Sequence, residues 1–260
     1  MPKSAKTSFK KYLIGFWLIF FIPFFILSML IFMASKGWIG ESLPTFEELE
    51  NPKSNLASEI ISSDDVVIGK YFKENRTNVH YYELSPNLIN ALKATEDIRF
   101  ESHSGVDLRG LLRVIFRAGT AGGGSTITQQ LAKNLFHETP HSKTDRAIQK
   151  FQEWIIAVQL ERRYTKEEIL AMYLNTVEFS SNAYGIKSAS QAYFGKTPAQ
   201  LNIQESAVLV GMLQAPTRYN PVRNPKNSLA RRNVVLHQME KYRFLTEKQL
   251  DSIQALPIKL

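Results

Sequence analysis

The chain has 260 residues, a formal net charge of +8 and no cysteine. Its length suffices for one good-sized domain and a membrane anchor, and the lack of cysteine excludes a disulfide framework and thiol chemistry. The positive charge is compatible with either nucleic acid or anionic lipid as a partner, so other features must decide between them.

An apolar segment near the N-terminus predicts a transmembrane helix. Residues 12–34 carry no charge and span roughly 33 Å as a helix, the thickness of a bilayer's hydrocarbon core. Four lysines precede this segment and Lys36 alone follows it closely. The positive-inside rule therefore places residues 1–11 in the cytoplasm and the remainder outside. The run is too long for a cleaved signal peptide, and an anchored domain meets lipid rather than nucleic acid.

The rest of the chain reads as a linker followed by one domain. Residues 35–58 are polar and contain two prolines, as linkers do. From residue 59, β-branched and aromatic clusters up to Leu84 predict two or three short strands, and helix signals dominate from Ser85 to residue 256. Prolines that follow Ser85 and Thr197 suit first helical positions. Helices are predicted at 86–101, 107–118, 126–137, 145–163, 167–175, 183–194, 203–213, 226–244 and 247–255.

The first dense motif is Glu96-Asp-Ile-Arg-Phe-Glu-Ser-His-Ser-Gly105. Glu96 ends a predicted helix, and for an isolated glutamate a solvated helix charge is the commoner explanation. Acid–base chemistry instead requires a carboxylate on a rigid element beside an open cleft, with its protonation set by its neighbours. The motif as a whole favours the chemical interpretation.

The segment that follows, residues 107–118, combines basic and apolar residues. Arg109, Arg113 and Arg117 recur every fourth residue, while leucine, isoleucine and phenylalanine fill the rest. One interpretation is an amphipathic helix with a solvated basic face. The other is a helix at the lipid interface, which a membrane anchor on the same chain makes at least as plausible.

The second motif is Gly122-Gly-Gly-Ser-Thr-Ile-Thr-Gln-Gln-Leu-Ala-Lys-Asn134. A flexible turn that caps a helix, with Thr126 and Gln129 as a capping box, would explain the glycines. It would not explain the hydrogen-bond donors that follow. Backbone amides at a helix start together with Lys133 suit a pyrophosphate.

The predicted helix 145–163 carries a third candidate site. An apolar stripe at helical spacing is predicted to face the core, made of Phe151, Trp154, Ile155 and Val158. Glu153 lies on the other side, which is also largely apolar, so partial burial beside Lys150 is expected. Spacing alone leaves a structural ion pair and a functional site equally open.

Together these motifs resemble those of the peptidoglycan glycosyltransferases (glycosyltransferase family 51), over about Ser58 to Leu256. The family's first motif is Glu-Asp-x-x-Phe-x-x-His-x-Gly, its second is Gly-Gly-Ser-Thr-Ile-Thr-Gln-Gln, and its third is Lys-x-x-Glu, here Lys150 and Glu153. The family usually has arginine where this chain has Gln149, so one phosphate-facing charge is either missing or supplied by Arg146. Later segments also resemble the family and are mostly assigned to packing and turns, namely Tyr173–Asn175, Ala183–Ile186, Tyr193–Lys196, Gln214–Pro216 and Tyr219–Pro221. Ser180 stands where the family more commonly has glycine.

The resemblance implies a mostly α, lysozyme-like fold with a small β element. It also implies an enzyme that joins lipid II units with inversion and releases undecaprenyl pyrophosphate outside a bacterial cytoplasmic membrane. Glu96 is expected to be the general base, and Glu153, the second catalytic residue, to orient a cation or a lysine. Residues 107–118 are expected to lie near the membrane. Substrate binding is assigned to Asp97, Phe100, His103, Gly123, Gly124, Ser125, Thr126, Gln129, Gln130, Lys133, Asn134, Arg146 and Lys150.

Lys133 and Lys150, with or without Mg²⁺, are expected to neutralise the pyrophosphate; neither a protein-built metal site nor an organic cofactor is predicted. The expected partners are lipid II, the growing glycan, the bilayer and other cell-wall synthesis proteins. Two rivals remain. One is a glycan-cleaving, lysozyme-like enzyme, and the other is a non-catalytic scaffold, which the intact carboxylates disfavour. No transpeptidase motif is present, which leaves open a monofunctional enzyme or the front half of a longer one.

Overall fold

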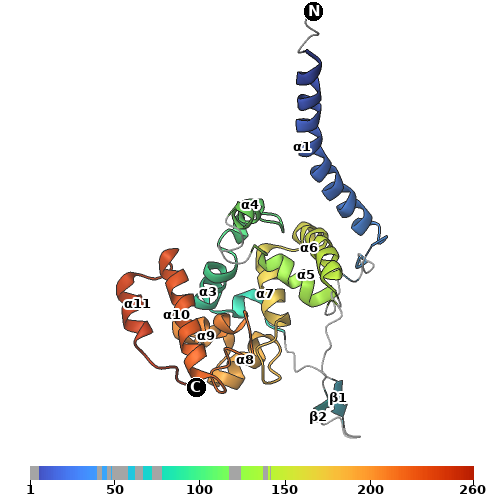
Figure 1. The fold of residues 1–260 in the computed structure, drawn as a ribbon. Coiled ribbons are helices and arrows are strands. Elements are labelled where there is room, and N and C mark those ends of the chain that lie inside the picture. Colours follow the sequence, from blue (N-terminus) through green and yellow to red (C-terminus); the bar gives the residue numbers. More distant parts are fainter. Residues whose placement is uncertain are drawn as a thin grey trace, which may run out of the picture.

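The computed structural model describes residues 6–39, 43–45, 48, 58–61, 67–71, 78–116, 124–136, 140 and 142–260. The first helix, α1 (Lys6–Ser35), extends away from the rest of the molecule and contacts α6 only near its end (Figure 1). Its stretch Phe9–Ser35 is long and apolar enough to cross a membrane, and its side chains are largely exposed. The helix therefore fits membrane anchoring.

The small β element is a two-stranded antiparallel sheet. It consists of β1 (Ser58–Ile61) and β2 (Val67–Tyr71). Of the two or three strands predicted, these two are present among the described residues, and the remaining cluster leads into a short 3-10 helix, η1 (Tyr81–Glu83). The backbone of Val79 pairs with a side chain instead of a strand: its N–H donates to Asn175 Oδ1 (3.0 Å) and its carbonyl accepts from Asn175 Nδ2 (2.9 Å).

The helices predicted from the sequence are all present, and the fold is mostly α. Capping supports these predictions: Ser85 caps α3 ahead of a proline, and Thr165 and Thr246 open capping boxes. The helix predicted at 86–101 is shorter than expected: α3 ends at Glu96, and a separate 3-10 helix, η2 (Phe100–Ser102), follows it. The helices are α3 (Pro86–Glu96), α4 (Leu108–Phe116), α5 (Ile127–Phe136), α6 (Lys143–Arg163), α7 (Lys166–Thr176), α8 (Gly185–Phe194), α9 (Ile203–Met212), α10 (Pro225–Lys241) and α11 (Glu247–Gln254).

The end of α3 lies between two groups of packed helices. On one side α3 packs against α9 and α10, and on the other α5 packs against α6 and α7 (Figure 1). Leu88 and Leu92 of α3 are completely buried. Burying apolar side chains on this scale is the main stabilising contribution to a fold of this kind. It also makes α3 a rigid support for Glu96 at its last residue.

Helix α6 turns the opposite face inward from the one predicted. Phe151, Trp154, Ile155 and Val158 are only half-buried, so the predicted core stripe is wrong. Spacing offered two candidate faces, and the face with more polar residues is the one that packs. Its buried residues are Gln149, Gln152, Glu153, Ile156, Ala157 and Leu160.

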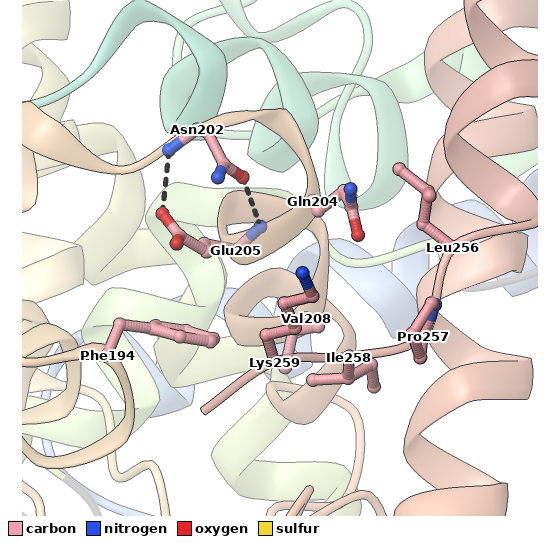
Figure 2. Close-up of a pocket in the computed structure, with 9 residues that line it drawn as sticks. All are labelled: Phe194, Asn202, Gln204, Glu205, Val208, Leu256, Pro257, Ile258 and Lys259. Atoms are coloured by element: carbon pink, nitrogen blue, oxygen red, sulfur yellow. Dashed lines mark hydrogen bonds between the residues drawn. The ribbon is translucent and has the colours of Figure 1, made fainter.

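A small cavity of about 180 Å³ lies between the end of α8, the start of α9 and the C-terminal tail (Figure 2). The tail is held by Arg232, whose buried guanidinium donates to the carbonyls of Gln254 (3.0 Å) and Leu256 (2.7 Å). Burial lowers the pKa of Arg232. This arginine therefore fastens the tail to α10.

Candidate active site

A cleft of about 690 Å³ opens at the end of α3. Its walls come from the starts of α4 and α5, from α6, and from α10. Seven cationic side chains and four carboxylates line it, so the cleft suits an anionic ligand. The cations are Arg99, Arg113, Lys133, Arg146, Lys150, Arg231 and Lys241, and the carboxylates are Glu96, Asp97, Asp107 and Glu153.

Gly105 joins the three motif-bearing segments. Its φ is +91°, and an added Cβ would lie 2.7 Å from the backbone carbon of Ala157 on α6, so only glycine fits. Its carbonyl accepts from Thr126 Oγ1 (2.6 Å) and Gln129 Nε2 (3.3 Å). The predicted capping box is therefore only half present: Thr126 Oγ1 accepts from the Gln129 N–H, but the Gln129 side chain is used elsewhere.

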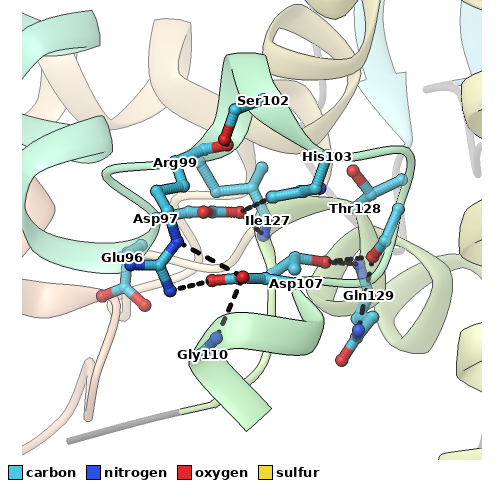
Figure 3. Close-up of polar contacts among 12 residues, drawn as sticks. Glu96, Asp97, Arg99, Ser102, His103, Asp107, Gly110, Ile127, Thr128 and Gln129 are labelled. Carbon is cyan, nitrogen blue, oxygen red and sulfur yellow. Dashed lines mark hydrogen bonds and ion pairs between the residues drawn. The ribbon is translucent and has the colours of Figure 1, made fainter. Parts of the chain in front are cut away.

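Asp97 and its neighbours hold the loop after α3 in place (Figure 3). Asp97 Oδ2 accepts from the Ile127 N–H at the start of α5 (3.2 Å) and lies 2.9 Å from His103 Nε2. Phe100 is completely buried, with the ammonium of Lys166 4.3 Å from its ring centroid. Phe100, His103 and the buried Gln129 do not line the cleft. The structure shows them supporting the loop, and their contact with substrate stays a prediction.

Glu96 is half-buried in the cleft wall and is held by a neutral partner. Its Oε2 accepts from Gln130 Nε2 (2.9 Å), and Gln130 Oε1 accepts from the hydroxyl of Tyr173 (2.8 Å). In the part of the chain that the structure describes, Glu96 forms no ion pair, whereas Asp107 and Glu153 each pair with a cationic side chain. A carboxylate without a cation partner is free to accept a proton.

Glu153 has the opposite environment. It is 1% exposed, and its two oxygens accept from Arg146 Nη1 and Lys150 Nζ, each at 2.6 Å. Lys150 also donates to Ser125 Oγ in the glycine-rich turn (2.8 Å). Burial lowers the pKa of Lys150, and Glu153 opposes this shift. Glu153 thus fixes two cations in the cleft wall, and Arg146 lies where the sequence allowed for a replacement charge.

Helix α4 points its leucines outward. Leu108 and Leu112 are 67% and 52% exposed, while Arg113 lines the cleft. Asp107 caps the helix by accepting from the Gly110 N–H (2.9 Å) and pairs with Arg99. Although burial opposes it, these bonds lower the pKa of Asp107. Arg113 thus brings part of the basic side of α4 into the cleft wall.

The other predicted binding residues divide into three groups. Asn134 is exposed and does not line the cleft, Gly123 lies outside the described residues, and the rest line the cleft. These are Gly124, Ser125, Thr126, Gln130 and Lys133.

Sequence reasoning missed the wall that α10 and the preceding loop contribute. Arg231, Val234, Gln238 and Lys241 recur at intervals of three and four residues, which is the signature of one helical face. Gln214, assigned to a turn from the sequence, also lines the cleft. The polar stripe of α10 was the available signal.

Within the described residues no group of three or more acidic, histidine or cysteine side chains could hold a metal. Both oxygens of Glu153 are taken by cations, and Asp107 is paired with Arg99. Because Mg²⁺ is often held by one or two carboxylates together with substrate phosphates, its participation alongside the substrate stays a prediction.

The comparisons with known proteins decide the family. The Transglycosylase family model matches residues 64–240. The chain belongs to this family.

Penicillin-binding protein 1A of Pseudomonas aeruginosa is 35% identical over 88% of this chain and 28% of its own length. Penicillin-binding protein 1A of Escherichia coli is 37% identical over 82% and 25%, and penicillin-binding protein 1A/1B of Bacillus subtilis is 37% identical over 99% and 28%.

These matches confirm the family that the motifs predicted. The transglycosylase chain spans about a quarter to a third of the length of these relatives. A crystal structure of penicillin-binding protein 1A from Haemophilus influenzae is 22% identical over 80% of this chain and 21% of that one, with a TM-score of 0.44. The family assignment rests on the sequence matches.

Proposed function

We propose that this transglycosylase polymerises lipid II into glycan strands and releases undecaprenyl pyrophosphate with inversion at the anomeric carbon. The observation that carries the proposal is the contrast in one cleft between Glu96, which has no cation partner, and a wall of cations that Glu153 holds in place. A base beside an anion-binding wall is what transfer from a glycosyl pyrophosphate requires.

In the proposed mechanism the donor pyrophosphate lies along Lys133, Arg146 and Lys150. Glu96 takes the proton from the acceptor's 4-hydroxyl as that oxygen attacks the anomeric carbon. The bond from this carbon to the pyrophosphate oxygen breaks on the opposite face, and the leaving group departs with the electron pair. The cations stabilise the charge that develops on it, and no step is assigned to Mg²⁺.

The α10 wall is proposed to bind the acceptor. Gln238 can hydrogen-bond sugar hydroxyls, while Arg231 and Lys241 can pair with anionic groups of a second substrate molecule. This wall and the Lys150 wall come from different groups of helices. The cleft thus offers separate surfaces for two substrates.

The glycan-cleaving rival fits the cleft less well. Glycosidases use two carboxylates, one of which protonates the leaving group while the other acts as a base or nucleophile. Glu153 cannot fill the second position, because it is buried and both of its oxygens bind cations. A transferase with a single base explains the arrangement better.

Membrane attachment is proposed to bring the cleft to its substrate. Helix α1 supplies an apolar stretch long enough to span the bilayer, and the exposed leucines of α4 would enter the lipid beside the cleft. The lysines before α1 favour a cytoplasmic N-terminus and an external catalytic domain. Other cell-wall synthesis proteins are proposed partners on the same side.

The test is polymerisation of labelled lipid II by the detergent-solubilised chain, beside the variant Glu96→Gln. Polymer from the wild type and none from the variant supports the proposal. Equal polymer from both removes Glu96 from the mechanism. Lipid II binding without polymer from the wild type favours a non-catalytic scaffold, and shortening of preformed glycan strands favours the cleaving enzyme.

A further inference from the structure

Tyr173 lies in the middle of α7, a position that sequence reasoning assigned to packing. Its side chain is 1% exposed, yet its hydroxyl reaches Gln130, which in turn contacts Glu96. We propose that Tyr173 is a positioning residue for the catalytic carboxylate and acts through the amide of Gln130. This inference rests on the proposed function, in which Glu96 is the base.

The chain of bonds fixes the direction of the Gln130 amide. An ionised carboxylate only accepts hydrogen bonds, so the amide nitrogen of Gln130 must face Glu96. The amide oxygen then faces Tyr173, whose hydroxyl donates to it over 2.8 Å. Burial, together with the charge of Glu96, raises the pKa of Tyr173 well above its ordinary value, so this hydroxyl keeps its proton throughout the neutral pH range.

Without the tyrosine hydroxyl, the amide of Gln130 keeps only its bond to Glu96. Its oxygen is left without a donor, and nothing on that side holds the amide in place. The buried surroundings of Tyr173 leave little room for water to replace its hydroxyl. The tyrosine therefore acts as a positional lock for Gln130.

The lock also determines which oxygen of Glu96 receives the proton. Oε2 is occupied by Gln130, which leaves Oε1 to face the acceptor hydroxyl. A general base has to lie within hydrogen-bond distance of the proton that it removes. Displacement of a reacting group by about 1 Å can reduce the rate about 100-fold, so a smaller disturbance through Gln130 is expected to lower kcat measurably.

The first experiment compares Tyr173→Phe with Tyr193→Phe in the full detergent-solubilised chain. Tyr193 is a matched control, since it is also buried and its hydroxyl bonds to the Phe179 carbonyl (2.8 Å), away from the cleft. Tyr173→Phe is expected to lower kcat for lipid II polymerisation about tenfold, with KM changed less than about twofold, as for an interaction that matters in the transition state. Tyr193→Phe is expected to retain wild-type kcat.

Melting temperatures of the two variants separate positioning from stability, and all rates are measured below the lower of the two. Wild-type kcat in Tyr173→Phe overturns the inference, and so does an equal fall in both variants. If the wild-type chain makes no polymer at all, the proposed function has failed instead. The two failures are therefore distinguishable.

A double-mutant cycle tests whether the effect passes through Gln130. Methionine is unbranched and similar in length to glutamine but cannot bridge the two oxygens, so Gln130→Met breaks the connection. In that background Tyr173→Phe is expected to change kcat by less than about twofold, because residues in one network are not additive. A full tenfold fall in both backgrounds would show that Tyr173 acts by another route and would overturn the inference.

Discussion

Glu96 and Glu153 line the same cleft and are the same residue type, but their surroundings differ. Glu96 is half-buried and accepts a hydrogen bond from a neutral amide. Glu153 is almost fully buried and accepts from two cations at 2.6 Å. A carboxylate whose two oxygens both accept from cations holds those cations in place. The contrast supports the proposal that Glu96 takes the proton and that Glu153 positions the charges.

Beyond the loss of polymer expected for Glu96→Gln, the largest effect is expected from shortening the base while keeping its charge. Glu96→Asp withdraws the carboxylate by one methylene and breaks its 2.9 Å bond from Gln130. Such a displacement is expected to lower kcat about 100-fold without lowering the melting temperature. Steady-state polymerisation and thermal unfolding measure both. A kcat within twofold of wild type would end the distinction between the two glutamates.

Glu153→Gln is expected to have a smaller effect on rate and a larger one on stability. It leaves Arg146 and Lys150 without their carboxylate, but these side chains are 40% and 28% exposed, so water can solvate them in part. A loss of about 1–2 kcal/mol in the free energy of unfolding is expected, with kcat/KM about 30-fold lower as charge stabilisation weakens. Urea unfolding and initial rates test this. Unchanged stability would contradict the anchoring role.

The alkaline limb of activity gives a third test. Burial lowers the pKa of Lys150 from its ordinary 10.5, while Glu153 raises it. Lys150 therefore loses its charge at a lower pH than an exposed lysine. As pH rises, kcat/KM should begin to decline before pH reaches 10.5. In Glu153→Gln the opposing influence is gone, so the limb should move to lower pH. In Lys150→Arg it should move to higher pH, and an identical limb in all three proteins would exclude Lys150 as its cause.

The smallest effect on activity is expected from a substitution in the α10 wall, which contains neither glutamate. Arg231→Ala removes a cation from α10 while leaving the partners of Glu96 and Glu153 intact. If the acceptor binds there, KM should rise about fivefold with kcat nearly unchanged, as for loss of uniform binding. A fall in kcat alone would instead connect α10 to the chemical step.

Much of the cleft was predictable from the sequence because its motifs are local. Glu96 with Asp97, the glycine-rich turn, and Lys150 with Glu153 are each contiguous or one helical turn apart, and the structure brings all of them to the cleft. Capping residues likewise fixed most helix starts. These features depend on neighbours in the chain, which a sequence displays directly.

What the sequence concealed depends on contacts between distant segments. Asn175 supplies the partner for the Val79 backbone, which pairs with this side chain instead of a strand. The inward face of α6 depends on which helices pack against it, and the contribution of α10 depends on the fold as a whole. Ser180 also gains an explanation that the sequence could not give: its φ is +64°, a conformation that glycine adopts without strain, so the family's commoner glycine is accounted for.

Adjacent arginines give α10 two simultaneous duties. Arg231 lines the cleft. Arg232 donates hydrogen bonds to the carbonyls of Gln254, at the end of α11, and of Leu256 in the tail. Because the two arginines are neighbours on one helix, α10 connects the C-terminal segment directly to one wall of the cleft.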